Sequence, residues 1–420
     1  MAQAVAVRLG SAELLERLRG LMLWLTGFSG AFVFVEPSPY EVVGLLTMAL
    51  FLVSGLSLRA GHMPLILMLL AYGLGLTIGL IPVLGRNQTL MWTLVSWFLV
   101  GTAVFYACAL ADQTGRRLDY LMAGYTAAAA IVAALAILAY FRLIPDAEAM
   151  LLYGRAKGTF NDPNVLGPFL VLPALLALRR VLGGSAQSFA AGAALLALFL
   201  VALLLTFSRG AWMHFAISAV LYVGFLLAVS DSGRARTRIA VESLAAAALA
   251  TVAIVVLLNT EAVSKLFEIR ASLEQSYDVG YLGRFGRHIL GALLALDHPF
   301  GIGPLQFHLY FPEDPHNVYL NSFMAGGWIA GVSFLLLVAL TLYVGFQGVR
   351  ARTPWRPVLL AVYAAFIGVA IEGAIIDIDH WRHFWLLLGV LWGGAIAALR
   401  VAPSPARPYS SAARSVAQPG

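Results

Sequence analysis

Apolar stretches long enough to cross a membrane recur along the whole chain. They predict twelve spans, near residues 19–35, 40–58, 63–84, 88–111, 118–141, 164–178, 185–207, 210–230, 237–258, 318–347, 357–376 and 383–399. The longest stretch without a predicted span is residues 259–315. We therefore expect transmembrane helices 1–9 in residues 1–258, a loop domain with helices in 259–315, transmembrane helices 10–12 in 316–400, and a disordered cytoplasmic tail rich in Pro, Ser and Ala in 401–420.

Composition agrees with this pattern. The chain is 61% hydrophobic and 11% charged, with a mean hydropathy of +0.86. These values exclude a soluble globular protein and indicate an all-α polytopic membrane protein. The single cysteine, Cys108, lies inside an apolar stretch, which excludes a disulfide within the chain and a cysteine-based metal site.

The distribution of cations predicts the orientation. If the N-terminus is cytoplasmic and the spans alternate, most of the 27 Lys and Arg residues fall on the cytoplasmic side. Both termini are then cytoplasmic, and residues 259–315 lie outside the membrane. Four cations of that outer segment, Lys265, Arg270, Arg284 and Arg287, oppose the usual bias, so we expect them to hold an anion. The net charge of +6 otherwise reflects orientation and contact with anionic membrane lipids, and gives no case for nucleic acid.

A histidine lies at the start of the tenth span. Asp314 is a good N-cap and Pro315 fits a first helical turn, so we expect His316 in that turn. The helix dipole would then favour a neutral imidazole, which can act as a general base. The alternative is a polar helix start at the level of the lipid headgroups.

A similar Asp-Pro pair precedes the sixth span, in the block from Gly158 to Gly167. Asp162 and Pro163 are expected to open a helix there, with Arg155 and Lys157 just before it. Two helix N-termini on one side of the membrane would favour anions. The alternative is helix capping alone.

An arginine occupies the very short turn between the seventh and eighth spans, in Thr206-Phe207-Ser208-Arg209-Gly210. An arginine near the hydrocarbon costs about 2–3 kcal/mol at the middle of a span and less at its edge. We favour a function for Arg209, because a shorter polar residue could form the same turn at a lower cost in free energy. The alternative is a side chain that reaches back to the membrane surface.

Arg284 and Arg287 are one helical turn apart and can share a face. A pair of guanidinium groups suits bidentate contact with a diphosphate. The alternative is an amphipathic helix at the protein surface.

The last external turn carries Asp377 and Asp379, a spacing that can hold a divalent metal. We favour pairing of these carboxylates with Arg382 over a metal. Glu372, inside the eleventh span, is the better candidate for an internal polar contact.

Taken in order, these motifs resemble those of the O-antigen ligase and polymerase superfamily of bacterial inner-membrane glycosyltransferases. The resemblance spans about residues 150–335. It is carried by Gly-Thr-Phe-Asn-Asp-Pro-Asn at 158–164, Thr-Phe-Ser-Arg-Gly-Ala at 206–211, Gly-Arg-Phe-Gly-Arg at 283–287, Pro-Phe-Gly-Ile-Gly at 299–303, His-Asn-Val-Tyr-Leu at 316–320 and Gly-Gly-Trp-Ile-Ala-Gly at 326–331.

The resemblance implies a GT-C-like fold and a periplasmic site. The family's essential histidine matches His316, and its arginine after the seventh span matches Arg209. Its loop arginine matches Arg284 best, with Arg287 and Arg270 as alternatives. Candidates for supporting contacts are Arg155, Lys157, Asn161, Asn164, Asn317 and Tyr319. The chain departs from the family at Ala325, where many members have Glu, and at His288, where many have Trp.

The expected function is that of an O-antigen ligase. It would transfer O-antigen polysaccharide from undecaprenyl diphosphate to lipid A–core, with inversion and with neither metal nor cofactor. An O-antigen polymerase of the same superfamily is the first alternative, and a protein O-glycosyltransferase of that superfamily the second. A lipid or polysaccharide transporter is the alternative from another class, and it would need no catalytic base.

Overall fold

The computed structural model describes residues 2–35, 37–183, 186–271 and 280–401. Within these ranges, nine helices are long and apolar enough to cross a membrane. The predicted all-α polytopic membrane fold is therefore confirmed. The tail expected in 401–420 lies outside the described residues, apart from Val401 at the end of the last helix.

Each of the twelve predicted spans coincides with a helix. These helices are α1 (Ala2–Ser29), α2 (Pro39–Ser54), α3 (Met63–Leu80), α4 (Asn87–Leu110), α5 (Thr114–Tyr140), α6 (Pro163–Val181), α7 (Ala186–Leu205), α8 (Arg209–Val229), α9 (Gly233–Leu258), α12 (Val318–Arg350), α13 (Arg356–Glu372) and α14 (Arg382–Val401). Between α9 and α12 lie α10 (Glu261–Ala271), α11 (Arg284–Asp297) and the 3₁₀ turn η4 (Phe307–Leu309). Three further 3₁₀ turns are η1 (Ala60–His62), η2 (Ile81–Val83) and η3 (Ala147–Met150). A short antiparallel hairpin, β1 (Leu151–Leu152) and β2 (Arg155–Ala156), follows η3.

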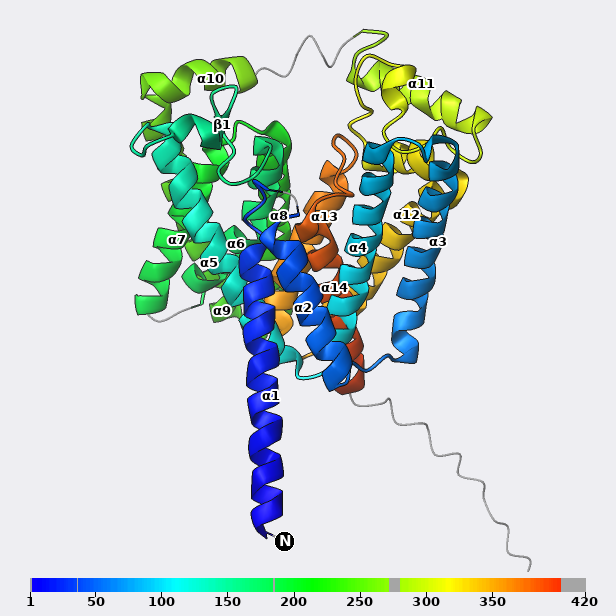
Figure 1. The fold of residues 1–420 in the computed structure, drawn as a ribbon. Helices are drawn as coiled ribbons and strands as arrows, with labels where there is room; N and C mark the ends of the chain where they lie inside the picture. The colour runs from blue at the N-terminus through cyan, green and yellow to red at the C-terminus, as the bar shows by residue number, and fades with distance from the viewer. Residues whose placement is uncertain (1, 36, 184–185, 272–279, 402–420) are drawn as a thin grey trace, which may run out of the picture.

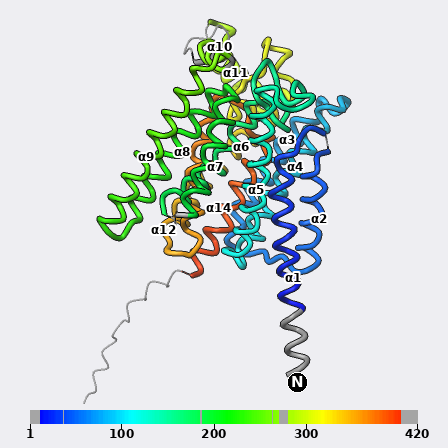
Figure 2. Tube along the Cα trace, turned by 90° about the vertical axis from the view of Figure 1, so that its left-hand side faces the viewer, coloured from blue at the N-terminus to red at the C-terminus, as the bar shows by residue number. Residues whose placement is uncertain are grey.

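The helices form one bundle with a well-packed centre and a loose edge. The main pairs are α3 with α12, α1 with α5, α6 with α7, α4 with α14, and α8 with α13. Most residues of α6 and α14 are buried, whereas no residue is buried in the most apolar 18-residue window of α9. Figure 2 shows α9 at the edge of the bundle.

The two ends of the bundle differ (Figure 1). One end, called the loop end below, carries α10, α11 and the β1–β2 hairpin. The opposite end, called the terminal end, carries the start of α1 and the end of α14. Helix α1 begins far below the other helices in this view and ends at Ser29, six residues before the predicted end of the first span.

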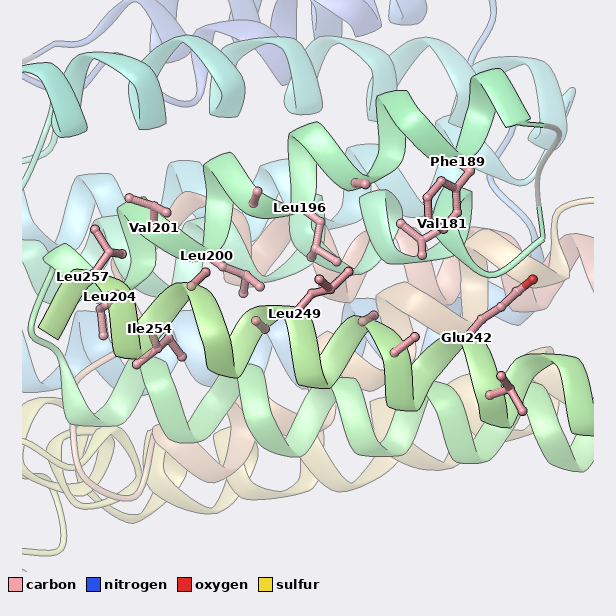
Figure 3. Close-up of a pocket in the computed structure, with 17 residues that line it drawn as sticks. Val181, Phe189, Leu196, Leu200, Val201, Leu204, Glu242, Leu249, Ile254 and Leu257 are labelled. Carbon is pink, nitrogen blue, oxygen red and sulfur yellow. The ribbon is translucent and has the colours of Figure 1, made fainter. Parts of the chain in front are cut away.

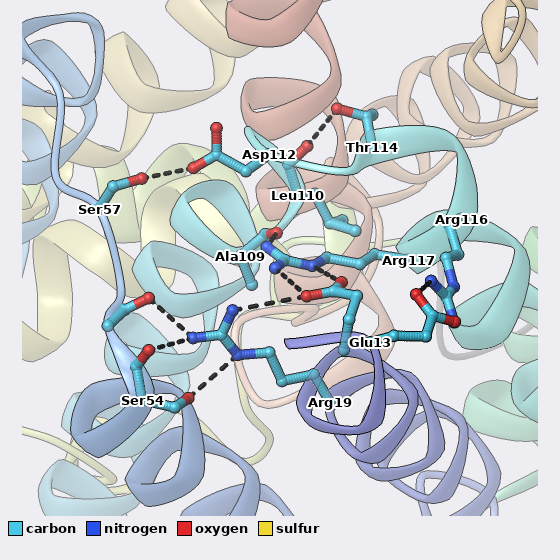
Figure 4. Close-up of polar contacts among 12 residues, drawn as sticks. Glu13, Arg19, Ser54, Ser57, Ala109, Leu110, Asp112, Thr114, Arg116 and Arg117 are labelled. Atoms are coloured by element: carbon cyan, nitrogen blue, oxygen red, sulfur yellow. Dashed lines mark hydrogen bonds and ion pairs between the residues drawn. The ribbon is translucent and has the colours of Figure 1, made fainter. Parts of the chain in front are cut away.

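Charged residues at the terminal end hold α1 in place (Figure 4). The buried guanidinium of Arg117 on α5 donates to both carboxylate oxygens of Glu16, at 2.6 and 2.7 Å. Arg19 on α1 donates to the hydroxyl and the carbonyl of Ser54 at the end of α2, at 3.0 and 2.5 Å. Both guanidinium groups also lie over the ring of Phe51, each 5.2 Å from its centroid. These contacts give two cations of the terminal end, Arg19 and Arg117, a structural role.

Helix α12 is interrupted near its loop end. Gly326 and Gly327 leave helical geometry, and Gly327 has φ +66° and ψ −162°. The segment from Pro299 to Gly303 fills the break. The Trp328 amide donates to the Pro299 carbonyl at 2.9 Å, and the Met324 carbonyl accepts the Ile302 amide at 2.8 Å. A Cβ on Gly327 would lie 2.3 Å from the Pro299 oxygen, so glycine is required there. This docking fixes the loop that leads from α11 to His316.

Candidate functional site

The first turn of α11 packs against the chain just before α12. His288 donates from Nε2 to the Pro315 carbonyl at 2.7 Å. Arg287, only 3% exposed, donates to the Leu282 carbonyl at 3.0 Å and to the Glu313 carboxylate at 2.8 Å. Arg284 is the first residue of the same helix. The structure therefore brings α11, with Arg284 and Arg287, beside His316. The sequence predicted that the two arginines share a helix, but not that this helix contacts the chain before α12.

His316 does not lie in a helical turn. The predicted N-cap at Asp314 is wrong, because α12 starts at Val318 and its N-cap is Asn317, whose side-chain oxygen accepts the Leu320 amide at 3.1 Å. His316 precedes this cap with φ +47°, a left-handed conformation that is uncommon outside glycine. The imidazole is therefore presented by a turn.

The environment of His316 lowers its pKa. Burial is the main cause, and the positive charges of Arg284 and Arg287 add to it, while Asp314 and Glu313 oppose it. Burial and the same two arginines also lower the pKa of His288. A neutral imidazole was predicted from the helix dipole, but in the structure desolvation and neighbouring cations favour it.

Two contacts from the segment after α13 hold this turn. The Asn317 amide donates to Oδ1 of Asp377 at 3.1 Å, and the Val318 amide donates to the Gly373 carbonyl at 2.9 Å. Burial, followed by the nearby Asp379 and Asp314, raises the pKa of Asp377 well above its usual range. Asp377 therefore supports the backbone next to His316.

The predicted pairing of Asp377 and Asp379 with Arg382 is wrong. Arg382 donates instead to Glu41 on α2, from Nε at 2.8 Å and from its terminal nitrogen at 2.6 Å. The partner was not predictable because Glu41 is far away in the sequence. Among the described residues, no group of three or more His, Cys, Asp or Glu side chains has the arrangement of a metal site.

A second group surrounds the start of α6. Asp162 caps this helix as predicted, accepting the Asn164 amide at 2.7 Å, and Pro163 is its first residue. The buried Arg155 donates to the Asn164 side chain and to the Thr206 carbonyl, both at 2.8 Å. Arg155 thus ties the start of α6 to the turn between α7 and α8.

Arg209 is the first residue of α8, directly after this turn. Its N-cap is Ser208, and the preceding Phe207 has φ +47°, the same arrangement as at His316 and Asn317. A Cβ on Gly210 would lie 2.9 Å from Oε1 of Glu372, so the glycine permits close approach of this carboxylate.

Glu372 makes the predicted internal polar contact. Its Oε2 lies 2.9 Å from Nδ1 of His214 on α8, and both side chains are buried. Because Glu372 precedes Gly373 and Asp377, one segment at the end of α13 contacts the start of α8 and the start of α12. The segment 372–377, called the bridging segment below, thereby links the Arg209 group to the His316 group.

The remaining candidates are more scattered. Tyr319 donates its hydroxyl to the Ala370 carbonyl at 2.6 Å, which is a contact between α12 and α13. Asn161 is exposed and Lys157 is partly exposed in the chain before α6. Arg270 lies near the end of α10, and its side chain is outside the described part of the structure.

Sequence reasoning missed the bridging segment and His214. Glu372 and Asp377 were each singled out, but for separate roles. A single buried histidine in α8 carries no distinctive pattern, so His214 gave no signal in the sequence.

The fold and this cationic, histidine-bearing end define a class: a polytopic α-helical membrane protein with a polar site at its loop end. Residues 194–335 match the family described as O-antigen ligase. The predicted resemblance to the O-antigen ligase and polymerase superfamily is therefore confirmed over this segment. A search of curated proteins finds no match to the chain.

The matched segment covers part of the site. It contains Arg209, Arg270, Arg284, Arg287, His316, Asn317 and Tyr319. Arg155 and the Asp162 cap precede it, and the bridging segment follows it. Contacts from outside the matched segment thus help to hold the residues within it.

Proposed function

We propose that this protein is an O-antigen ligase: it transfers O-antigen polysaccharide from undecaprenyl diphosphate to the lipid A–core oligosaccharide. The observation that carries the proposal is the position of His316 within the matched family segment. Burial, together with the cationic first turn of α11, lowers the pKa of its imidazole and so favours the neutral form. A base next to cations suits a reaction in which a hydroxyl loses a proton while a diphosphate gains charge.

The proposed reaction is a single displacement. The acceptor hydroxyl oxygen forms a bond to the anomeric carbon of the donor and gives its proton to His316. The bond between that carbon and the diphosphate oxygen breaks, and the electron pair leaves with the diphosphate. Attack opposite the leaving group inverts the anomeric centre. Neither metal nor cofactor takes part, because Arg209 and Arg284 stabilise the leaving group, with Arg287 or Arg270 in support.

The proposed location is the inner membrane of a Gram-negative bacterium, with the loop end in the periplasm. The bias of Lys and Arg supports a cytoplasmic terminal end, and both the start of α1 and the end of α14 lie there. The proposed parts of the chain are 1–258 and 316–400 in the membrane, with 259–315 as the periplasmic loop domain. Membrane lipids are the remaining partners.

Product analysis tests the proposal. Purified protein in sealed proteoliposomes is given lipid-linked O-antigen together with lipid A–core. We expect glycan on lipid A–core, which His316→Ala abolishes while the variant still folds and binds the lipid diphosphate. Elongated lipid-linked glycan would instead identify a polymerase. Translocation of lipid-linked glycan that survives His316→Ala, without any product, would indicate a transporter.

A further inference from the structure

An apolar groove runs along the outside of the bundle between α7 and α9 (Figure 3). Its volume is about 390 Å³, and its lining comes from α7, α9 and the end of α6. Alanines on the facing sides of the two helices, among them Ala193, Ala197, Ala246 and Ala250, leave the space open. Glu242 is the one charged residue of this lining, and Figure 3 shows it near the end of the groove that Phe189 also lines.

The groove matches a long chain-shaped apolar ligand. Its lining on α9 runs from Val241 to Leu257, which is about 24 Å at 1.5 Å per residue. That length approaches the hydrocarbon thickness of a bilayer, about 30 Å. A globular ligand would not need such a length, whereas an extended lipid chain would fill it.

The other end of the groove leads to the candidate site. Leu204 and Leu257 line this end. Two residues beyond Leu204 is Thr206, whose carbonyl accepts a hydrogen bond from the buried Arg155, and Arg209 follows at the start of α8. An apolar groove that ends close to the start of α8, where Arg209 lies, is complementary to an amphiphile with a long apolar tail and an anionic head.

Taking the proposed function as its basis, we propose that the groove between α7 and α9 binds the polyprenyl chain of the lipid-diphosphate donor. The tail lies between the two helices, and the diphosphate is held at the start of α8, next to Arg209. Because lipid tails are as apolar as the groove, burial from water contributes no driving force here. The groove acts through packing and alignment, which place the diphosphate at the same depth in the membrane as Arg209.

Filling the groove tests this directly. Ala250→Trp places a large side chain into it, whereas Ala247→Trp places the same side chain on an exposed part of α9 that does not line the groove. Transfer is measured with the undecaprenyl donor and with an analogue that carries a ten-carbon chain. We expect Ala250→Trp to lower kcat/KM about tenfold for the long donor only, and Ala247→Trp to behave as wild type. A tenfold change corresponds to about 1.4 kcal/mol.

A binding measurement separates this inference from the proposed function. A photoreactive undecaprenyl diphosphate should label α7 and α9 in the wild type and in Ala247→Trp, and much less in Ala250→Trp. This result stands even if no glycan is transferred. Labelling that is confined to other helices, or equal losses of transfer for long and short donors in Ala250→Trp, would overturn the proposed groove.

Discussion

At the scale of single residues, Arg209 and Arg284 reach the loop end from separate parts of the chain. Each is the first residue of its helix, α8 or α11. If both contact one diphosphate, a lysine should not replace either, because it cannot make a bidentate contact. We expect Arg209→Lys and Arg284→Lys each to slow transfer roughly a hundredfold, equivalent to about 3 kcal/mol.

The double variant decides whether the two arginines act together. Its loss should be smaller than the product of the two single losses, since both act on one group. Arg142→Lys is the matched control, because Arg142 is half-exposed, pairs with Glu148 and is not a proposed diphosphate contact. Steady-state kinetics on these variants measure the effect. Strictly multiplicative losses would show that the two arginines do not contact the same diphosphate.

The pH dependence of transfer provides a second test at this scale. Arg284 helps to lower the pKa of His316. Arg284→Gln removes that positive charge, so the pKa of His316 should rise toward its ordinary value near 6.5. More of the imidazole is then protonated at a given pH, and the acid limb of kcat/KM should move to higher pH.

The pH profile has two controls. His288→Gln should retain an acid limb, because His288 donates to a backbone carbonyl and is not the proposed base. Arg142→Gln should leave the limb in place. A limb that does not move in Arg284→Gln, or that disappears in His288→Gln, would assign the titration to another group.

Local sequence signals were sufficient to predict the N-cap of α6 but not that of α12. Asp162 and Pro163 open α6 as predicted, since nothing overrides their capping. Asp314 and Pro315 carry the same signal, yet Asn317 caps α12. The start of α12 differs because of tertiary contacts: Asp377 and Gly373 accept hydrogen bonds from the backbone amides of Asn317 and Val318. No pattern of neighbouring residues reports such contacts.

At the scale of elements, the break in α12 should be sensitive to a single methyl group. Gly327→Ala would force alanine into a backbone conformation that is essentially restricted to glycine, at a cost of about 1–3 kcal/mol, and would also clash with the Pro299 oxygen. We expect a lower unfolding temperature and weak transfer, measured by thermal unfolding and by the transfer assay.

Gly101→Ala is the matched control for this change. Gly101 lies in α4 with open space around its Cβ position, so alanine should leave stability unchanged or raise it slightly. Equal behaviour of the two variants would show that the α12 break does not require Gly327.

The sequence predicted the helices well but not this break. Long apolar stretches identify spans directly, because bilayer thickness sets their length. Gly326 and Gly327 lie within such a stretch and leave its hydropathy almost unchanged. The motif from Pro299 to Gly303 was recognised only through a resemblance, and its docking into α12 depends on contacts that are not local in the sequence.

At the scale of the whole molecule, the orientation in the membrane can be tested by labelling. Cys108 is buried and can be replaced by alanine to give a cysteine-free background. Glu268→Cys on α10 at the loop end should then react with a membrane-impermeant thiol reagent applied to the periplasmic side. Ser232→Cys, at the start of α9, should react only after the membrane is permeabilised.

Both positions are exposed, so accessibility within the protein does not distinguish them. The reverse labelling pattern would place the loop end in the cytoplasm and overturn the proposed periplasmic reaction. It would leave the fold and the match of residues 194–335 to the O-antigen ligase family unchanged.

The bridging segment also has a consequence for biosynthesis. A ribosome that has synthesised the chain through α12 has already delivered His316 and the arginines to the membrane, but not yet Glu372, Gly373 or Asp377. The backbone next to His316 is then without two of its hydrogen-bond partners. These contacts therefore form only when the penultimate helix has been inserted, so a nascent or prematurely terminated chain would lack the link between the Arg209 group and the His316 group.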